Sequence, residues 1–201
     1  MFPTRVLVVC CLLAFVCAAS RAADEKPKEQ APAPRLVSKK YTIHFKDAKW
    51  DDVLDWYAKE TGLVLITPVK PTGTVSITPS KDRTFTVGEV TDFLNEAMMQ
   101  QKFILIRRHM TFFIQPADEK MEPRDRIARY RRVTLGELAE CGRTELVQVL
   151  LPVQGIAAED ALDELTRLLT PFGTMTAVKD NALLISDTVR NIVRIQKTLE
   201  T

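Results

Sequence analysis

Apolar and polar positions follow two local periods along residues 41–114, and these periods predict a first group of elements. Residues 41–45 alternate between apolar and polar side chains, which predicts a strand with one buried face. Apolar residues recur three and four positions apart from Trp50, which predicts a helix, and Gly62 is placed to end it. A continuous apolar run at residues 63–67 predicts a buried strand.

The same group continues with a strand, a helix and a hairpin. Residues 75–77 begin and end with apolar side chains around a polar one and predict the strand. Thr86 and Glu89 stand three positions apart before an apolar stripe, the pattern of a capping box, and predict the start of the helix. Two apolar runs at 103–106 and 111–114 predict a closing hairpin, so the predicted order is β-α-β-β-α-β-β.

Residues 144–201 predict a second, shorter group with the order β-α-β-β-α. An apolar strand run at 146–153 precedes a helix that Pro171 ends, because the residue before a proline resists helical geometry. Two short apolar runs then pair as a hairpin. Ser186 or Asp187 is expected to cap the last helix.

Together the two groups predict an α+β protein of two small domains, each a sheet with helices packed on it, the second with a KH-like order. Between them lies a polar, arginine-rich stretch that we interpret as a linker and junction, with a short strand and one helical turn at residues 133–142. The predicted organisation is a signal peptide at 1–22, a flexible tether at 23–40, a first domain at 41–117, the junction at 118–143 and a second domain at 144–201.

Residues 1–22 have the composition of a secretory signal peptide. Arg5 supplies a positive start, residues 6–19 are apolar, and small residues precede a cleavage point before Ala23. The apolar run is shorter than the roughly 20 residues of a spanning helix, which favours cleavage over an uncleaved anchor. We therefore expect an exported, periplasmic protein.

Removal of this leader changes the charge and the cysteine content. The whole chain carries 28 Lys and Arg against 26 Asp and Glu, and the leader holds two of the arginines and no acid, so the mature chain is neutral. A neutral chain has no overall field that favours nucleic acid or an anionic membrane. Of the four cysteines only Cys141 remains, so the mature chain forms no intramolecular disulfide. Cys141 is then either a small buried apolar residue or one half of an intermolecular disulfide.

The sequence contains no residue pattern typical of an enzyme or a metal site. His44 and His109 are isolated, and no HExxH, CxxC, Gly-x-Ser-x-Gly or Walker spacing occurs. The second domain shares its order with nucleic-acid-binding KH domains, but their GxxG loop is missing after Gly155. We expect no catalytic activity, no cofactor, no metal, no small-molecule substrate and no nucleic-acid partner.

Two charged regions are the candidate interaction sites. The arginines of the junction either pair with acids of the chain's own domains or form a docking strip for an acidic partner. In the second domain one predicted helix is mainly acidic and the other basic, which suits a head-to-tail contact between copies, the alternative being that these charges only solvate the domain. The residues of these two regions are Arg124, Arg126, Arg129, Arg131, Arg132, Asp163, Glu164, Arg190 and Arg194.

Short motifs in both groups are similar to those of a known family. The first group resembles the short N-terminal domain of secretins and TonB-dependent signalling receptors, in its opening strand at 41–45, in Glu60-Thr-Gly-Leu-Val64 and in Phe112-Phe-Ile114. The second group resembles the βαββα ring-building domain that follows it in secretins, through residues 146–153 and Asn181-Ala-Leu-Leu-Ile-Ser-Asp187.

This resemblance implies a non-enzymatic interaction module of a type II secretion or type IV pilus apparatus. In the family, the first domain meets inner-membrane components and the second builds the ring wall. The implied partners are other copies of this chain or a full-length secretin, with inner-membrane components, in a periplasmic complex associated with the outer membrane. Secretins continue into further repeats and a channel, so we expect either a stand-alone module or part of a longer secretin. The alternative is a periplasmic signalling adaptor of the TonB-receptor type.

Overall fold

The elements of the N-terminal half, residues 39–118, follow one another in the predicted order. The computed structural model describes residues 39–80, 83–118, 125 and 128–200, so the predicted signal peptide and most of the predicted tether lie outside it. The elements of this half are β1 (Phe45–Lys49), α1 (Trp50–Thr61), β2 (Val64–Leu65), β3 (Thr74–Ile77), α2 (Val87–Met99), β4 (Phe103–Arg107) and β5 (Thr111–Pro116).

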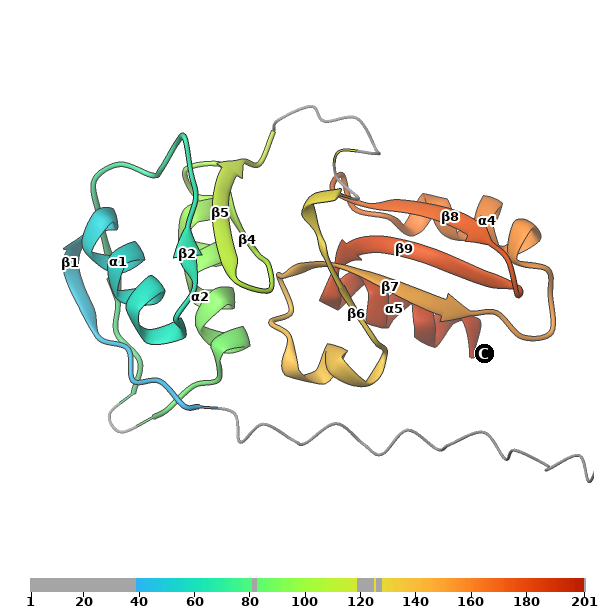
Figure 1. Ribbon diagram of the computed structural model, residues 1–201, viewed down its shortest axis with the longest axis horizontal. Helices are drawn as coiled ribbons and strands as arrows, with labels where there is room; N and C mark the ends of the chain where they lie inside the picture. The colour runs from blue at the N-terminus through green and yellow to red at the C-terminus, as the bar shows by residue number, and fades with distance from the viewer. Residues whose placement is uncertain (1–38, 81–82, 119–124, 126–127, 201) are drawn as a thin grey trace, which may run out of the picture. The chain divides into compact units, whose positions relative to one another are not determined.

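Two small sheets organise this half. β1 and β3 pair antiparallel, and a second sheet has the order β2-β5-β4, with β2 parallel and β4 antiparallel to β5. α1 and α2 pack against the second sheet (Figure 1). Its helix-facing side chains form one core with those of both helices, among them Leu54, Tyr57, Leu94, Leu105, Phe112 and Ile114.

The helix ends are set by local chemistry that the sequence predicts. Gly62 adopts φ 72° and its N–H donates to the carbonyl of Ala58, which ends α1 as predicted. At the start of α2, the backbone N–H of Glu89 donates to the Thr86 hydroxyl at 3.2 Å, and the Thr86 N–H donates to the Glu89 carboxylate at 2.9 Å. The predicted capping box is therefore confirmed.

Two strand predictions in this half are wrong in detail. The opening strand runs over Phe45–Lys49, whereas Tyr41 makes only an isolated bridge to Phe85. The β1–β3 pairing itself contains a bulge between Phe45 and Ala48, where Asp47 adopts φ 49°. The run at 63–67 is not a buried strand, because β2 stands at a sheet edge and its residue Val64 is exposed.

The C-terminal half, residues 128–200, is built around one four-stranded sheet of order β6-β7-β9-β8. α4 and α5 cover one face of this sheet (Figure 1) and share its core. The predicted order β-α-β-β-α is present, and with both halves in place the predicted α+β class is confirmed. The elements are β6 (Arg131–Val133), η1 (Gly136–Glu140), β7 (Leu146–Pro152), α4 (Ala158–Leu165), η2 (Thr166–Leu168), β8 (Thr174–Val178), β9 (Ala182–Thr188) and α5 (Val189–Leu199).

The junction supplies an extra strand, and the last helix begins later than predicted. β6 adds to the sheet by parallel pairing with β7, and η1 follows it as the predicted helical turn. Ser186 and Asp187 lie in β9 and do not cap α5, whose N-cap residue is Thr188 without a side-chain cap. Asp187 is fully buried and instead accepts hydrogen bonds from the backbone N–H of Thr170 at 2.9 Å and from Asn191 at 2.6 Å.

Apolar packing continues from one half into the other through β4. Leu105 faces the helices, whereas its neighbours Ile104 and Ile106 face the opposite way and pack with Tyr130 and Leu146 of the C-terminal half. We call this second group of side chains the junction cluster. Val37–Thr201 accordingly forms one compact unit. The domain boundaries at 41–117 and 144–201 stay a prediction.

The two halves also approach closely at a pair of glycines. A Cβ atom on Gly88, in the first turn of α2, would lie 2.6 Å from the backbone nitrogen of Gly142. Real side chains essentially never come this close to backbone, so only glycine fits at this contact.

We expect Gly88→Ala to lower the free energy of unfolding by about 1–3 kcal/mol, the usual cost of forcing atoms into a packed site. Without the close contact, alanine would stabilise the helix by up to about 1 kcal/mol relative to glycine. A decrease in the free energy of unfolding therefore indicates the contact, and an increase indicates its absence. The measurement is denaturant unfolding of the mature protein. The matched control is Gly136→Ala, whose Cβ would meet nothing within 4 Å. Equal stability of Gly88→Ala and wild type would contradict the close approach.

Candidate functional site

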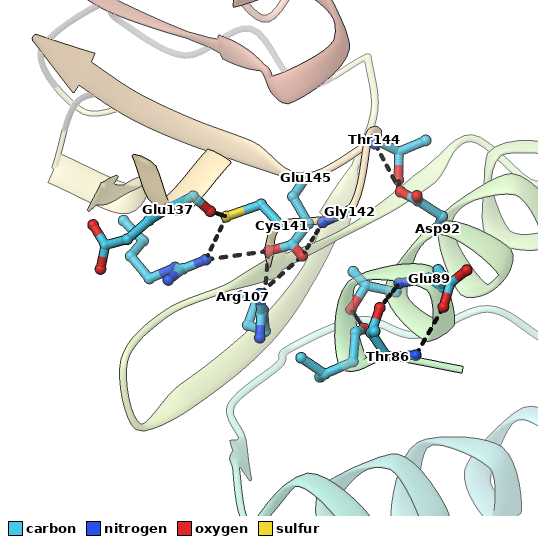
Figure 2. A network of polar contacts seen from close by, with 12 residues as sticks. Thr86, Glu89, Asp92, Arg107, Glu137, Cys141, Gly142, Thr144 and Glu145 are labelled. Atoms are coloured by element: carbon cyan, nitrogen blue, oxygen red, sulfur yellow. Dashed lines mark hydrogen bonds and ion pairs between the residues drawn. The ribbon is translucent and has the colours of Figure 1, made fainter. Parts of the chain in front are cut away.

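Residues 142–145, which we call the junction loop, connect the two halves by polar contacts. The Glu145 carboxylate has only 2% of its side chain exposed and accepts from Nη2 and Nε of Arg107, each at 2.9 Å. It also accepts from the backbone N–H of Gly142 at 2.7 Å. Figure 2 shows Glu145 between these two donors. A second cation, Arg131 of β6, lies 3.7 Å from the same carboxylate.

The Arg107–Glu145 pair has the geometry that makes an ion pair strong. The guanidinium fork meets both carboxylate oxygens, an arrangement that fixes direction as well as distance. Burial alone would lower the pKa of Arg107, but the adjacent charge and hydrogen bonds of Glu145 raise it above its ordinary value. Arg107 therefore remains charged inside the protein.

Asp92 of α2 fastens the same loop from the other side. Its carboxylate accepts from the backbone N–H groups of Arg143 at 2.8 Å and Thr144 at 2.7 Å, and from the Thr144 hydroxyl at 2.6 Å. Asn95, one turn later, donates to that hydroxyl at 3.2 Å and accepts from the N–H of Leu105 in β4 at 2.8 Å. One face of α2 therefore positions both the junction loop and β4.

The junction loop is also held from the C-terminal half. The N–H groups of Val189 and Arg190, the first residues of α5, donate to the carbonyls of Glu145 and Arg143, each at 2.9 Å. These contacts join the junction loop to elements of both halves, so the arrangement holds those elements in place. Among the residues that the structure describes, no cluster of His, Cys, Asp and Glu could hold a metal ion.

The predicted arginine strip is only partly described. Arg124 and Arg126 lie outside the described residues. Arg129 donates to the Gln115 side chain at 3.1 Å, Arg131 faces Glu145, and Arg132 donates to the Gln148 side chain at 3.0 Å. All three thus make contacts within the chain, Arg131 with an acid and Arg129 and Arg132 with amide side chains. A docking strip for an acidic partner stays a prediction.

The charged helices of the C-terminal half present the predicted residues outward. Asp163 and Glu164 on α4 are exposed, as are Arg190 and Arg194 on α5. Arg194 also donates to the carbonyl of Leu168 at 2.7 Å. A substitution of Arg194 would therefore also remove a contact within the C-terminal half. A substitution of Arg190 is the simpler test of a contact between copies. That contact stays a prediction.

Apart from Arg131 and Arg190, which the sequence singles out, the residues of the junction loop and its partners were not predicted. One signal for them exists: residues 103–106 are apolar at every position, whereas a strand buried on one face alternates. Such a run predicts a strand covered on both faces, and Arg107 directly follows it. Nothing in the local sequence singles out Asp92 or Glu145 among the other acids.

Cys141 lies beside this network and is partly buried. Its Sγ accepts from Arg131 at 3.1 Å. It also donates to the carbonyl of Glu137 at 3.3 Å, and Figure 2 shows Cys141 beside Glu137. Burial raises the pKa of the Cys141 thiol. A raised pKa leaves less thiolate near neutral pH, and the thiolate is the reactive form.

We therefore expect Cys141 to react with a thiol reagent more slowly in the native protein than in denaturant. The measurement is the labelling rate of the mature chain at mildly alkaline pH, with a short peptide spanning Cys141 as the unburied control. Native labelling as fast as that of the peptide, or a dimer on a non-reducing gel, would contradict this and favour the intermolecular disulfide.

We expect Arg107→Leu to lower the free energy of unfolding by about 3–5 kcal/mol, because it leaves the Glu145 carboxylate buried without its main partner. Glu145→Gln should cost less, and the double variant should cost less than the sum of the two single variants. Denaturant unfolding of all four proteins measures this cycle. Arg143→Leu is the control, because the side chain of Arg143 is exposed and the residue meets Asp92 through its backbone N–H. Additive single effects would show that the pair is not coupled.

Several solved structures are similar to this chain. The N-terminal domain of the secretin XcpQ from Pseudomonas aeruginosa matches at 22% identity over 81% of this chain and 64% of that chain, with a TM-score of 0.34. This chain thus spans less than two thirds of the XcpQ structure. The V. cholerae type IV competence pilus secretin PilQ matches at 18% identity over 79% of this chain and 37% of that chain, with a TM-score of 0.31.

A chain of the Klebsiella pneumoniae type II secretion system outer membrane complex of PulD, PulS and the PulC HR domain matches with a TM-score of 0.55. The match has 16% identity and covers 79% of this chain and 26% of that chain. No protein-family model and no curated protein matches the sequence. For the fold, the predicted resemblance to secretin periplasmic N-terminal domains is confirmed.

Proposed function

We propose that this chain is a non-enzymatic, periplasmic protein-interaction module of a type II secretion or type IV pilus secretin-like apparatus. The observation that carries the proposal is the fold shared with a chain of the Klebsiella complex, a structure that holds PulD together with PulS and the PulC HR domain. By analogy, this chain would bind other copies of itself or a full-length secretin, together with inner-membrane components of the apparatus.

The internal contacts support a role in assembly. The buried Arg107–Glu145 pair and the junction cluster hold the two halves in one arrangement, and a fixed arrangement lowers the entropy that binding must overcome. Within the described ranges, no helix has the length and apolar character needed to cross a membrane. Export then rests on the leader at residues 1–22, which lies outside those ranges.

Contacts between copies would use the charged helices of the C-terminal half. The acidic surface of α4 in one copy would meet the basic surface of α5 in the next, a heterologous contact of the kind that closes into rings. Surface ion pairs contribute only about 0–1 kcal/mol each. The isolated protein should therefore associate weakly.

We expect Arg190→Glu with Arg194→Glu to abolish self-association, because like charges would then face each other. Adding Asp163→Arg and Glu164→Arg should partly restore it. Sedimentation at high protein concentration and low salt measures the oligomer. Arg190→Glu alone is the control for the internal contact of Arg194, and unfolding curves show whether each variant folds. A wild type that stays monomeric, or one oligomer shared by all variants, would exclude this contact.

We expect the tagged full-length chain to be isolated from the envelope fraction with its first residues removed, together with secretin or inner-membrane secretion components. Mild crosslinking before detergent extraction, followed by mass spectrometry of the N-terminus and of the captured proteins, tests this. A chain with Met1 intact in the cytoplasm would overturn the export proposal. Capture of a membrane regulator of a sigma factor would support the signalling adaptor instead.

A further inference from the structure

The face of the β2-β5-β4 sheet that points away from α1 and α2 is only half covered. The strand register places Val64 of β2 on this face with Thr111 and Phe113 of β5. Ile66 directly follows β2, and its N–H donates to the carbonyl of Phe112 at 3.0 Å, which continues the same alternation. At its β4 side the face is covered by the junction cluster. At its β2 side it is open, and Val64 and Ile66 are each 59% exposed.

Exposed apolar side chains gather at this open side. Among the described residues, the large apolar side chains with high exposure are Val64, Ile66, Val69, Met99, Met110, Leu150 and Ile156. Two of them, Ile66 and Val69, line one groove, Val64 shares the face of Ile66, and Met110 lines the hollow beside it. Single exposed apolar residues are ordinary, whereas a contiguous group marks an interaction surface.

The groove has the size and lining of a binding site. Its volume is about 580 Å³, and its walls include Ile66, Val69, Phe113 and Pro116. Pockets that hold small molecules have volumes on the order of 300–1,000 Å³, so the groove is large enough to hold several side chains. The groove is also continuous with the interface between the two halves, because Phe113 lines it and packs against the junction cluster.

Positive charge adjoins one end of the groove. The guanidinium of Arg108 lies 5.8 Å from the centre of the Phe113 ring, and Arg108 and Thr111 line both the groove and a second hollow of about 560 Å³. The second hollow is lined by more arginines than acids: Arg108, Arg131 and Arg132 against Glu137. The Glu137 carboxylate already accepts from the N–H and hydroxyl of Thr134, which lower its pKa.

We infer that this open sheet face binds an extended segment of a partner protein in which apolar side chains are followed by an acidic one. The apolar side chains would occupy the groove at Ile66 and Val69, and the carboxylate would pair with Arg108 at the adjoining hollow. β2 is at the edge of its sheet, so an extended segment could pair with it as an added strand. Alternate side chains of that segment would then point to the open face, where the groove lies. The inference deepens the proposed function and rests on it, since an assembly module needs a partner for such a surface.

The test is selection of short random peptides displayed on phage against the immobilised mature protein. Enriched peptides are then synthesised with a fluorophore and their binding is measured by anisotropy. We expect enriched sequences to combine apolar residues with Asp or Glu, and their binding to weaken as salt is raised, because screening reduces the pairing with Arg108.

Matched variants locate the binding. Ile66→Asp and Arg108→Glu should each weaken binding about tenfold or more, as truncation of central contacts does. Because Arg108 also donates to the carbonyls of Ala128 and Arg129, Val69→Asp and Arg108→Gln serve as second variants, and unfolding curves check that all fold. Leu150→Asp and Arg167→Glu change an exposed apolar and an exposed basic residue outside the groove and should leave binding unchanged.

Several results would overturn the inference. These are the absence of enriched peptides, enriched peptides without acidic residues, or equal binding to the wild type, Ile66→Asp and Arg108→Glu. Self-association that Ile66→Asp abolishes would show that a second copy occupies the groove and would overturn it too. The selection contains no secretion component, so its failure leaves the co-isolation from the envelope as an independent test of the proposed function.

Discussion

The buried carboxylate of Glu145 is the constraint on which the arrangement of this protein depends. A carboxylate with 2% of its side chain exposed must be compensated from within the protein. Its compensation comes from three separate parts of the chain: Arg107 at the end of β4, the N–H of Gly142, and Arg131 in β6. Each part must therefore occupy one position relative to the others.

Apolar packing and polar contacts have different roles at this junction: the first stabilises it and the second fixes its geometry. A buried ion pair contributes little net stability relative to an apolar substitute, because desolvation offsets the attraction between its charges. The favourable free energy comes instead from side chains such as Ile104, Ile106 and Leu146, each worth about 1.5–3 kcal/mol when fully buried. The ion pair instead fixes the orientation of the two halves, because a guanidinium that meets both carboxylate oxygens allows little rotation of one half against the other.

The sequence predicts those features of the fold that local chemistry determines. The α2 capping box, the end of α1 at Gly62 and the hairpin of β8 and β9 depend on residues a few positions apart, and all are present. The contacts that join the two halves at the site are long-range: the Asp92–Thr144 bonds join residues 52 positions apart. The local pattern of apolar and polar residues contains no signal for such contacts. Asp187 shows the same limit, because its bond to Thr170, 17 positions away, competes with the capping role that its neighbours suggest.

The two-faced burial of β4 bears on the order in which the chain becomes structured. During synthesis the N-terminal residues emerge first, and β4 leaves before Leu146. Until Tyr130 and Leu146 arrive, Ile104 and Ile106 have no cover on their side of the strand. An intermediate with only the N-terminal half folded would thus expose an apolar strand surface of the kind that promotes aggregation and that chaperones bind. The burial of β4, and with it the final structure of the N-terminal half, therefore depends on the folding of the C-terminal half.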